Sequence, residues 1–63
     1  MIETGSRFHN PVTGIADTYE VSSIADGMAF IFNVTKDEAC GSIPVTILEE
    51  HISNNIYVTG SRI

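Results

Sequence analysis

The chain has 63 residues, of which 43% are apolar, and its eight acidic and three basic residues give a formal net charge of −5. This length allows one small domain, residues 1–63, with a core of limited size, and the apolar fraction excludes an intrinsically disordered chain. Direct binding to nucleic acid is disfavoured, because Arg7, Lys36 and Arg62 are scattered along an acidic chain and form no basic patch.

The cysteine content and the first residues bear on the cellular compartment. Cys40 is the single cysteine, which excludes an internal disulfide and favours a reducing environment. Met1 is followed by no basic segment and no long apolar run, which disfavours a signal peptide or a membrane span. We therefore expect a cytoplasmic protein that does not contact the membrane.

The first part of the chain predicts two strands joined by a turn. Residues 5–9 form the first expected strand. Residues 10–14 have strong turn chemistry, because proline fixes its own φ and glycine supplies a positive φ. Residues 17–24 alternate apolar and polar side chains, as is typical of a half-buried strand. The following Asp26-Gly27 pair predicts a hairpin turn.

Residues 28–34 form the most apolar expected strand. We expect it to be central in the sheet and covered at least partly on both faces. Alternation divides its side chains into two sets, which are Met28, Phe30, Phe32 and Val34 on one face and Ala29, Ile31 and Asn33 on the other. Phe30 and Phe32 are expected core residues.

A charged hairpin tip at residues 35–38 leads to the fourth expected strand, residues 39–43. Gly41 is a candidate bulge residue within it. Pro44 should end this strand, because it has no amide hydrogen to donate to a neighbouring strand.

A short helix and a last strand follow. Thr46 and Glu49 match a capping box, in which each side chain bonds to the other residue's backbone amide. We expect the helix to end near Ser53, where Asn54 and Asn55 can adopt left-handed backbone angles. The side chains expected to point inward are Ile47, Leu48 and Ile52. Residues 56–59 form the last expected strand and residues 60–63 a frayed tail.

This order of elements predicts a mainly β fold. We expect a small five-stranded antiparallel barrel or curled sheet, with one short helix before the last strand. Closing the barrel would remove the exposed sheet edges that a small protein cannot otherwise protect. An open α+β sheet packed on the helix is the alternative.

The segment Gly41–Val58, GSIPVTILEEHISNNIYV, resembles the corresponding region of small SH3-like barrels. In both, a glycine, an Ile-Pro pair, a short helical turn and a final apolar strand come in the same order. The resemblance implies an SH3-like barrel fold. It does not extend to recognition of proline-rich peptides, because the aromatic ligand-binding motifs are missing and the chain has no Trp. The chain is also similar in style to small proteins of phages and mobile elements.

No combination of residues predicts catalysis or a cofactor. Cys40 and His51 are the only pair that resembles a nucleophile and a base, and nothing in the sequence places them within hydrogen-bonding reach. The cysteine and histidine residues have no chelating spacing, so we expect no metal site. The glycines are dispersed at strand ends and form no phosphate-binding run. We therefore expect no enzyme.

Tyr19 and Tyr57 can pack at the edge of the core with their rings buried and their hydroxyl groups in water, which we favour, or they can form part of a binding patch. If one surface binds a partner, the candidate residues are Tyr19, Tyr57 and Ile31. Ile31 lies on the second face of the most apolar strand, which a single small sheet can leave uncovered. An uncovered Ile31 beside Tyr19 would form a patch that favours dimerisation or a partner.

These observations favour a non-catalytic protein-interaction module that binds an unknown protein, or itself, through a sheet face or edge. The alternative is an acidic phage-type inhibitor that mimics nucleic acid and binds a basic host protein. The net charge permits this role, although only Asp37-Glu38 and Glu49-Glu50 place two acids together. A nucleic-acid-binding barrel is the weakest of the binding hypotheses.

Overall fold

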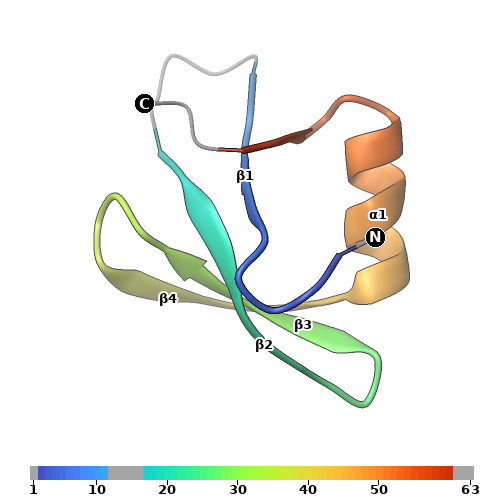
Figure 1. Ribbon diagram of the computed structural model, residues 1–63, viewed down its shortest axis with the longest axis horizontal. Helices are drawn as coiled ribbons and strands as arrows, with labels where there is room; N and C mark the ends of the chain where they lie inside the picture. The colour runs from blue at the N-terminus through green and yellow to red at the C-terminus, as the bar shows by residue number, and fades with distance from the viewer. Residues whose placement is uncertain (1, 12–16, 61–63) are drawn as a thin grey trace.

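The computed structural model describes residues 2–11 and 17–60 of the chain. Its elements in chain order are β1 (Arg7–His9), β2 (Tyr19–Ala25), β3 (Met28–Asn33), β4 (Glu38–Pro44), α1 (Val45–Ser53) and β5 (Val58–Thr59) (Figure 1). All elements expected from the sequence are present in the expected order, but β1 and β5 are shorter than the patterns predicted. Residues 12–16, which hold most of the expected turn at 10–14, lie outside the described residues.

The strands form one antiparallel open sheet in the order β4-β3-β2-β1-β5. The expectation of a closed barrel is therefore wrong, because closure would require β4 to pair with β5 and these strands form the two opposite edges. The α1 helix carries the chain from one edge to the other and packs against one face of the sheet (Figure 1). It buries that face in place of the strands of a closed barrel. β3 is an interior strand as expected, and β2 lies in the middle of the sheet.

Two irregularities of register bend the sheet. Between Val21 and Ser23 of β2 the pairing with β3 shifts by one residue, which leaves Ser22 as an extra residue. In β4, the two residues Cys40 and Gly41 lie opposite the single residue Ile31 of β3, which forms a second bulge. Gly41 has a φ of +84°, a backbone angle that glycine adopts without strain, so the expected bulge at this glycine is confirmed.

The core is small and comes from four different elements. Its buried apolar side chains are Phe8 of β1, Val21 of β2, Ala29 of β3 and Leu48 of α1. Partly buried apolar residues pack around them, namely Ile2, Tyr19, Ile31, Ile43, Val45, Ile52 and Tyr57. The sheet face that carries Val21, Ala29 and Ile31 is called the inner face below, and the opposite face the outer face.

The expectation that Phe30 and Phe32 belong to the core is wrong. Both lie on the outer face, where Phe30 is 43% exposed and Phe32 is half-buried outside the core cluster. The alternation of side chains along β3 was correct, but α1 packs on the face with the smaller residues. Ala29 is fully buried in the same cluster as Leu48, because its small side chain leaves room for the helix.

The start of α1 also differs from the prediction. Pro44 is both the last residue of β4 and the N-cap, and no side chain caps the helix. The expected capping box is wrong because the helix starts at Val45 and so places Thr46 inside its first turn. Glu49 instead accepts a hydrogen bond from the Ile2 amide at 3.3 Å. Ile47 is 38% exposed, contrary to expectation.

The end of α1 and the last strand follow the prediction more closely. The helix ends at Ser53, and Asn55 has the left-handed φ of 59°. β5 pairs with β1, where Phe8 faces Thr59. Within the expected tail, the Gly60 amide donates to the Arg7 carbonyl at 2.7 Å, and residues 61–63 lie outside the described residues.

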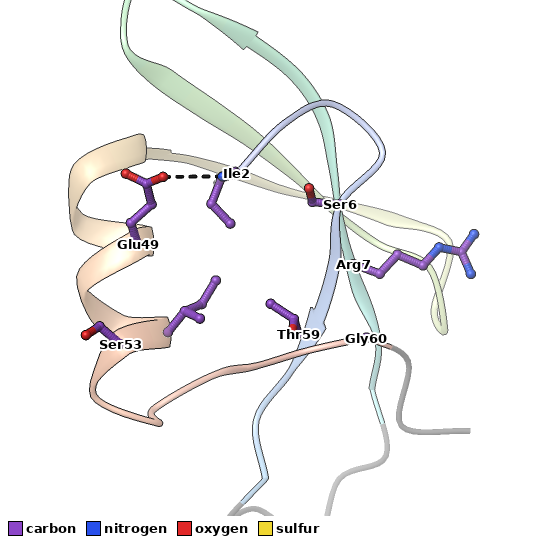
Figure 2. A pocket seen from close by; sticks show the side chains of 8 residues that line it. Ile2, Ser6, Arg7, Glu49, Ser53, Thr59 and Gly60 are labelled. Carbon is purple, nitrogen blue, oxygen red and sulfur yellow. Dashed lines mark hydrogen bonds between the residues drawn. The ribbon is translucent and has the colours of Figure 1, made fainter.

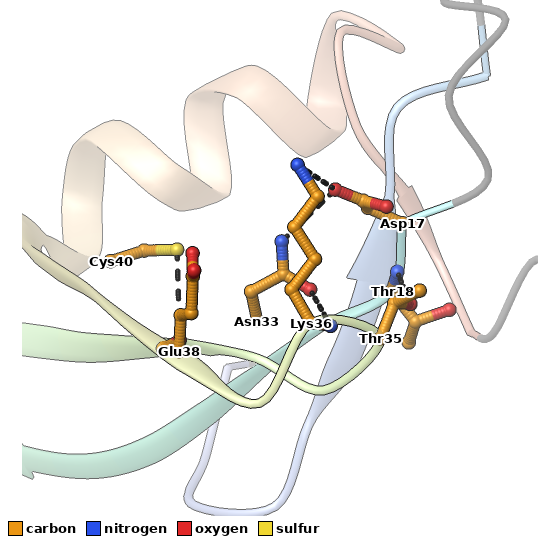
Figure 3. Close-up of polar contacts among 7 residues, drawn as sticks. All are labelled: Asp17, Thr18, Asn33, Thr35, Lys36, Glu38 and Cys40. Carbon is orange, nitrogen blue, oxygen red and sulfur yellow. Dashed lines mark hydrogen bonds and ion pairs between the residues drawn. The ribbon is translucent and has the colours of Figure 1, made fainter.

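A polar cluster joins the β3–β4 turn to the start of β2 (Figure 3). Asn33 is buried, and its Nδ2 donates to Oδ2 of Asp17 at 3.0 Å. The Lys36 amide donates to Oδ1 of Asn33 at 3.0 Å, and the Thr18 amide donates to Oγ1 of Thr35 at 2.8 Å. Because both polar ends of the Asn33 side chain have partners, its burial among apolar neighbours carries no unsatisfied group.

Candidate functional site

The outer face of β3 is apolar and uncovered. Phe30 lies directly opposite Ser23 on one side and Ser42 on the other, and neither side chain is large enough to cover its ring. The same pairing puts further apolar side chains on this face. Together they form what we call the outer patch, which consists of Ala25, Met28, Phe30, Phe32, Ala39 and Pro44. The alternation along residues 28–34 predicted which of these side chains share a face, but it could not predict which face α1 would cover.

The outer face carries balanced charge although the chain is acidic. Arg7 of β1 lies opposite Glu20 of β2, and Nε of the arginine is 2.9 Å from Oε1 of the glutamate. These two residues are the only Asp, Glu, Lys or Arg that strand pairing places on the outer face of the described strands. The described strand residues of this face therefore carry formal charges that cancel.

The residues expected to bind a partner gather on the inner face instead. Tyr19, Ile31 and Tyr57 all line a cavity of about 270 Å³ between the sheet and α1, together with Phe8, Ile43 and Leu48. We call it the inner cavity. The structure thus brings the three residues together, but each is half-buried and packs against the core. Ile31 is half-buried here and is not the uncovered side chain on which the expected patch depends.

Three aromatic rings meet at the inner cavity. Phe8 lies between the other two, with its ring stacked on Tyr19 at a centroid distance of 5.6 Å and in edge contact with Tyr57 at 5.1 Å. Burial raises the pKa of the Tyr19 hydroxyl group above its ordinary value, and the nearby Asp17 carboxylate raises it further. The neutral phenol is therefore stabilised at this site.

Cys40 and His51 occupy different surroundings. The Cys40 thiol is exposed, and its Sγ donates weakly to the Glu38 carbonyl oxygen at 3.9 Å. The His51 ring lies 5.9 Å from the Tyr57 ring, and its Nδ1 is buried without a hydrogen-bond partner. In the described part of the chain no hydrogen bond connects the thiol with the imidazole, so the structure does not assemble a nucleophile–base pair.

A second, more open cavity of about 470 Å³ lies between α1, β1 and β5 (Figure 2). Ile2 and Ile52 form its apolar part, and the Glu49 carboxylate is held at one end by the Ile2 amide. The Arg7 guanidinium points away from this space (Figure 2). Its Nε donates to Oε1 of Glu20. The polar residues of the lining besides Arg7 are therefore Glu49, whose carboxylate already has a partner, and the hydroxyl-bearing Ser6, Ser53 and Thr59.

Neither a metal site nor a membrane-spanning helix is found among the described residues. Across residues 2–11 and 17–60, no three His, Cys, Asp or Glu side chains gather in a way that could hold a metal ion. The α1 helix, the one helix in those ranges, is not long and apolar enough to cross a membrane.

Comparisons with protein-family models, with curated proteins and with solved structures find no match for this chain.

Proposed function

We propose that this chain is a non-catalytic interaction module that associates with a second copy of itself through the outer face of its sheet. The observation that carries the proposal is the 43% exposure of Phe30 at the centre of the outer patch. An uncovered aromatic side chain among apolar neighbours marks a surface that gains free energy when another surface covers it.

The strand edges are less suited to association than the face. β4 is one edge of the sheet, and it contains the bulge at Cys40 and Gly41 and ends at Pro44. Bulges and prolines block the regular hydrogen bonding that edge-to-edge pairing requires. The other edge, β5, has only two residues. Of the two modes expected from the sequence, association through a face is therefore favoured.

The charge of the outer face does not oppose a second copy as the partner. Two chains of net charge −5 repel each other over most of their surfaces. The outer face avoids this repulsion because Arg7 and Glu20 neutralise each other there. In a two-fold symmetric contact each copy supplies the same patch, so the two Phe30 rings would meet near the axis and the Arg7–Glu20 pairs would flank them.

The likeness to SH3-like domains enters this proposal only at the level of element order. Residues 38–59 form a strand, a helix and a strand. This is the order of elements expected from the resemblance of Gly41–Val58 to SH3-like barrels. That order supports a compact β module of the kind that presents a sheet surface, and the partner-binding surface that we propose lies on the outer face.

Sedimentation equilibrium from micromolar to millimolar concentration tests the proposal. The wild-type chain should show a monomer–dimer equilibrium, and Phe30→Ser should weaken it at least about tenfold, since removing a central aromatic anchor costs more than about 1.4 kcal/mol. Ile56→Ser is the matched control, because Ile56 is 44% exposed but lies outside the sheet, between α1 and β5. A monomeric wild type at all concentrations, or equal effects of the two substitutions, would refute the proposal.

A further inference from the structure

The inner cavity has apolar walls and a polar end. Its floor is formed by Phe8 and Leu48, which are almost fully buried, and Ile31 and Ile43 form an aliphatic wall. A volume of about 270 Å³ is close to the lower end of the range found for small-molecule sites. Apolar walls of this kind bind the hydrocarbon part of a small ligand.

No carboxylate lines the cavity itself, but two acidic residues, Asp17 and Glu38, belong to the part of the sheet next to Tyr19 and Cys40. Strand pairing aligns Tyr19 of β2, Asn33 of β3 and Glu38 of β4 in one row on the inner face. Asp17 belongs to the same end, because its Oδ2 accepts the hydrogen bond from Asn33. In Figure 3 the side chains of Glu38 and Cys40 rise on the same side of β4, toward α1. Cys40 itself lines the cavity.

One cation already belongs to this end. The Lys36 ammonium lies 3.8 Å from Oδ2 of Asp17 and so balances that carboxylate. Glu38 makes no ion pair with any described residue. Glu38 is exposed and lies two residues from Cys40 of the cavity lining, so its unpaired carboxylate favours a ligand whose positive charge projects from this end of the cavity.

We propose that the inner cavity binds a small organic amine, with its hydrocarbon part inside the cavity and its ammonium group at the end beside Glu38. The faces of aromatic rings attract cations, so Tyr19 and Tyr57 at the cavity add to the attraction of the carboxylate. An organic acid of the same shape would meet repulsion from Glu38, and a neutral alcohol would gain only the apolar contacts. This site goes beyond the proposed self-association, which uses the opposite face of the sheet.

Intrinsic fluorescence reports on this cavity directly. The chain has no Trp and only two Tyr residues, Tyr19 and Tyr57, and both line the cavity. The probes are cyclohexylmethylamine, cyclohexylmethanol and cyclohexanecarboxylate, which share one ring and differ in charge. The amine should change the tyrosine emission saturably, at least about fivefold more tightly than the alcohol, and the carboxylate should cause no change. Equal binding of amine and alcohol, or no saturable change with the amine, would overturn the proposal.

A pair of variants locates the charge. Glu38→Gln should weaken amine binding about two- to fivefold, the range for an exposed ion pair, and leave binding of the alcohol unchanged. Asp26→Asn is the control, because it removes the same charge from the β2–β3 turn, at the other end of the hairpin from Tyr19. Asn also tolerates the φ of 53° at this position. Equal effects of the two variants would mean that the net charge alone attracts the amine, and would refute the site. Both titrations are repeated in chains that also carry Phe30→Ser, so that a change in self-association cannot account for the result.

Discussion

Tyr19 holds its ring against the core and its hydroxyl group at the end of the inner cavity. Burial and the Asp17 carboxylate both disfavour the charged phenolate, so its pKa lies above the ordinary value of 10.0. This direction defines how the residue should contribute to stability. Below pH 10 the contribution is fully present, because the phenol is protonated in both the folded and the unfolded chain. Above pH 10 the unfolded chain loses this proton first, so stability falls as the pH rises through the folded-state pKa.

An absorbance titration of tyrosinate in a Tyr57→Phe chain measures the Tyr19 pKa alone, because Tyr19 is then the only tyrosine. We expect a midpoint above 10.0 in the folded chain and a midpoint near 10 after unfolding in urea. Tyr19→Phe should correspondingly reduce the loss of stability between neutral and alkaline pH. A folded-state midpoint at or below that of the unfolded chain would contradict the assignment of Tyr19 to a desolvated position.

For individual residues, the sequence predicted which side chains share a face better than it predicted which face is buried. The sequence favours packing of Tyr19 and Tyr57 at the edge of the core, and in the structure both pack partly buried against the core and line one cavity with Ile31. The period of two along β3 assigned Phe30 and Ile31 to opposite faces correctly. Which face becomes buried depends on where α1 packs, and a local pattern contains no information about that distant contact.

Among the elements, α1 shows how packing decides the contribution of an apolar residue to the free energy of unfolding. Leu48 and Ile47 are neighbours in the sequence, yet Leu48 is 1% exposed in the core and Ile47 is 38% exposed. We expect Leu48→Ala to lower the free energy of unfolding by about 2–5 kcal/mol, as loss of a buried leucine side chain does. Ile47→Ala should cost less than about 1 kcal/mol, because a surface substitution leaves no cavity.

Urea denaturation of both variants, followed by circular dichroism, tests this difference. Ile47→Ala serves as the control for the change in helix composition, because both substitutions introduce alanine into the same helix. Similar losses of stability would mean that α1 packs in another rotational position. A Leu48→Ala chain that does not fold would still agree with the prediction if Ile47→Ala folds normally.

The limits of the individual elements were predictable where a residue restricts its own backbone. Pro44 ends β4 and Gly41 allows the bulge because both restrictions are local. The capping box failed for the opposite reason. Thr46 and Glu49 have the right spacing, but Pro44 starts the helix directly, and the Glu49 carboxylate bonds to Ile2, which is 47 positions away in the sequence.

At the scale of the whole molecule, the proposed association should link stability to concentration. A dimer that forms only from folded chains stabilises the fold by mass action, so its melting temperature rises with protein concentration. We expect this rise for the wild type and for Ile56→Ser, and for Phe30→Ser a rise that begins only at concentrations at least about tenfold higher. Differential scanning calorimetry over a wide concentration range makes the comparison. A melting temperature of the wild type that does not change with concentration would contradict the self-association.

The strand order β4-β3-β2-β1-β5 also bears on how this protein folds. The strands β2, β3 and β4 are joined by short turns, so their pairing closes only short loops. The pairing of β1 with β5 instead joins residues far apart in the sequence, such as His9 and Gly60, which are 51 positions apart. A chain in which β5 has not yet paired therefore leaves one edge of β1 open, and such an unpaired edge is a site at which a second chain or a chaperone can bind.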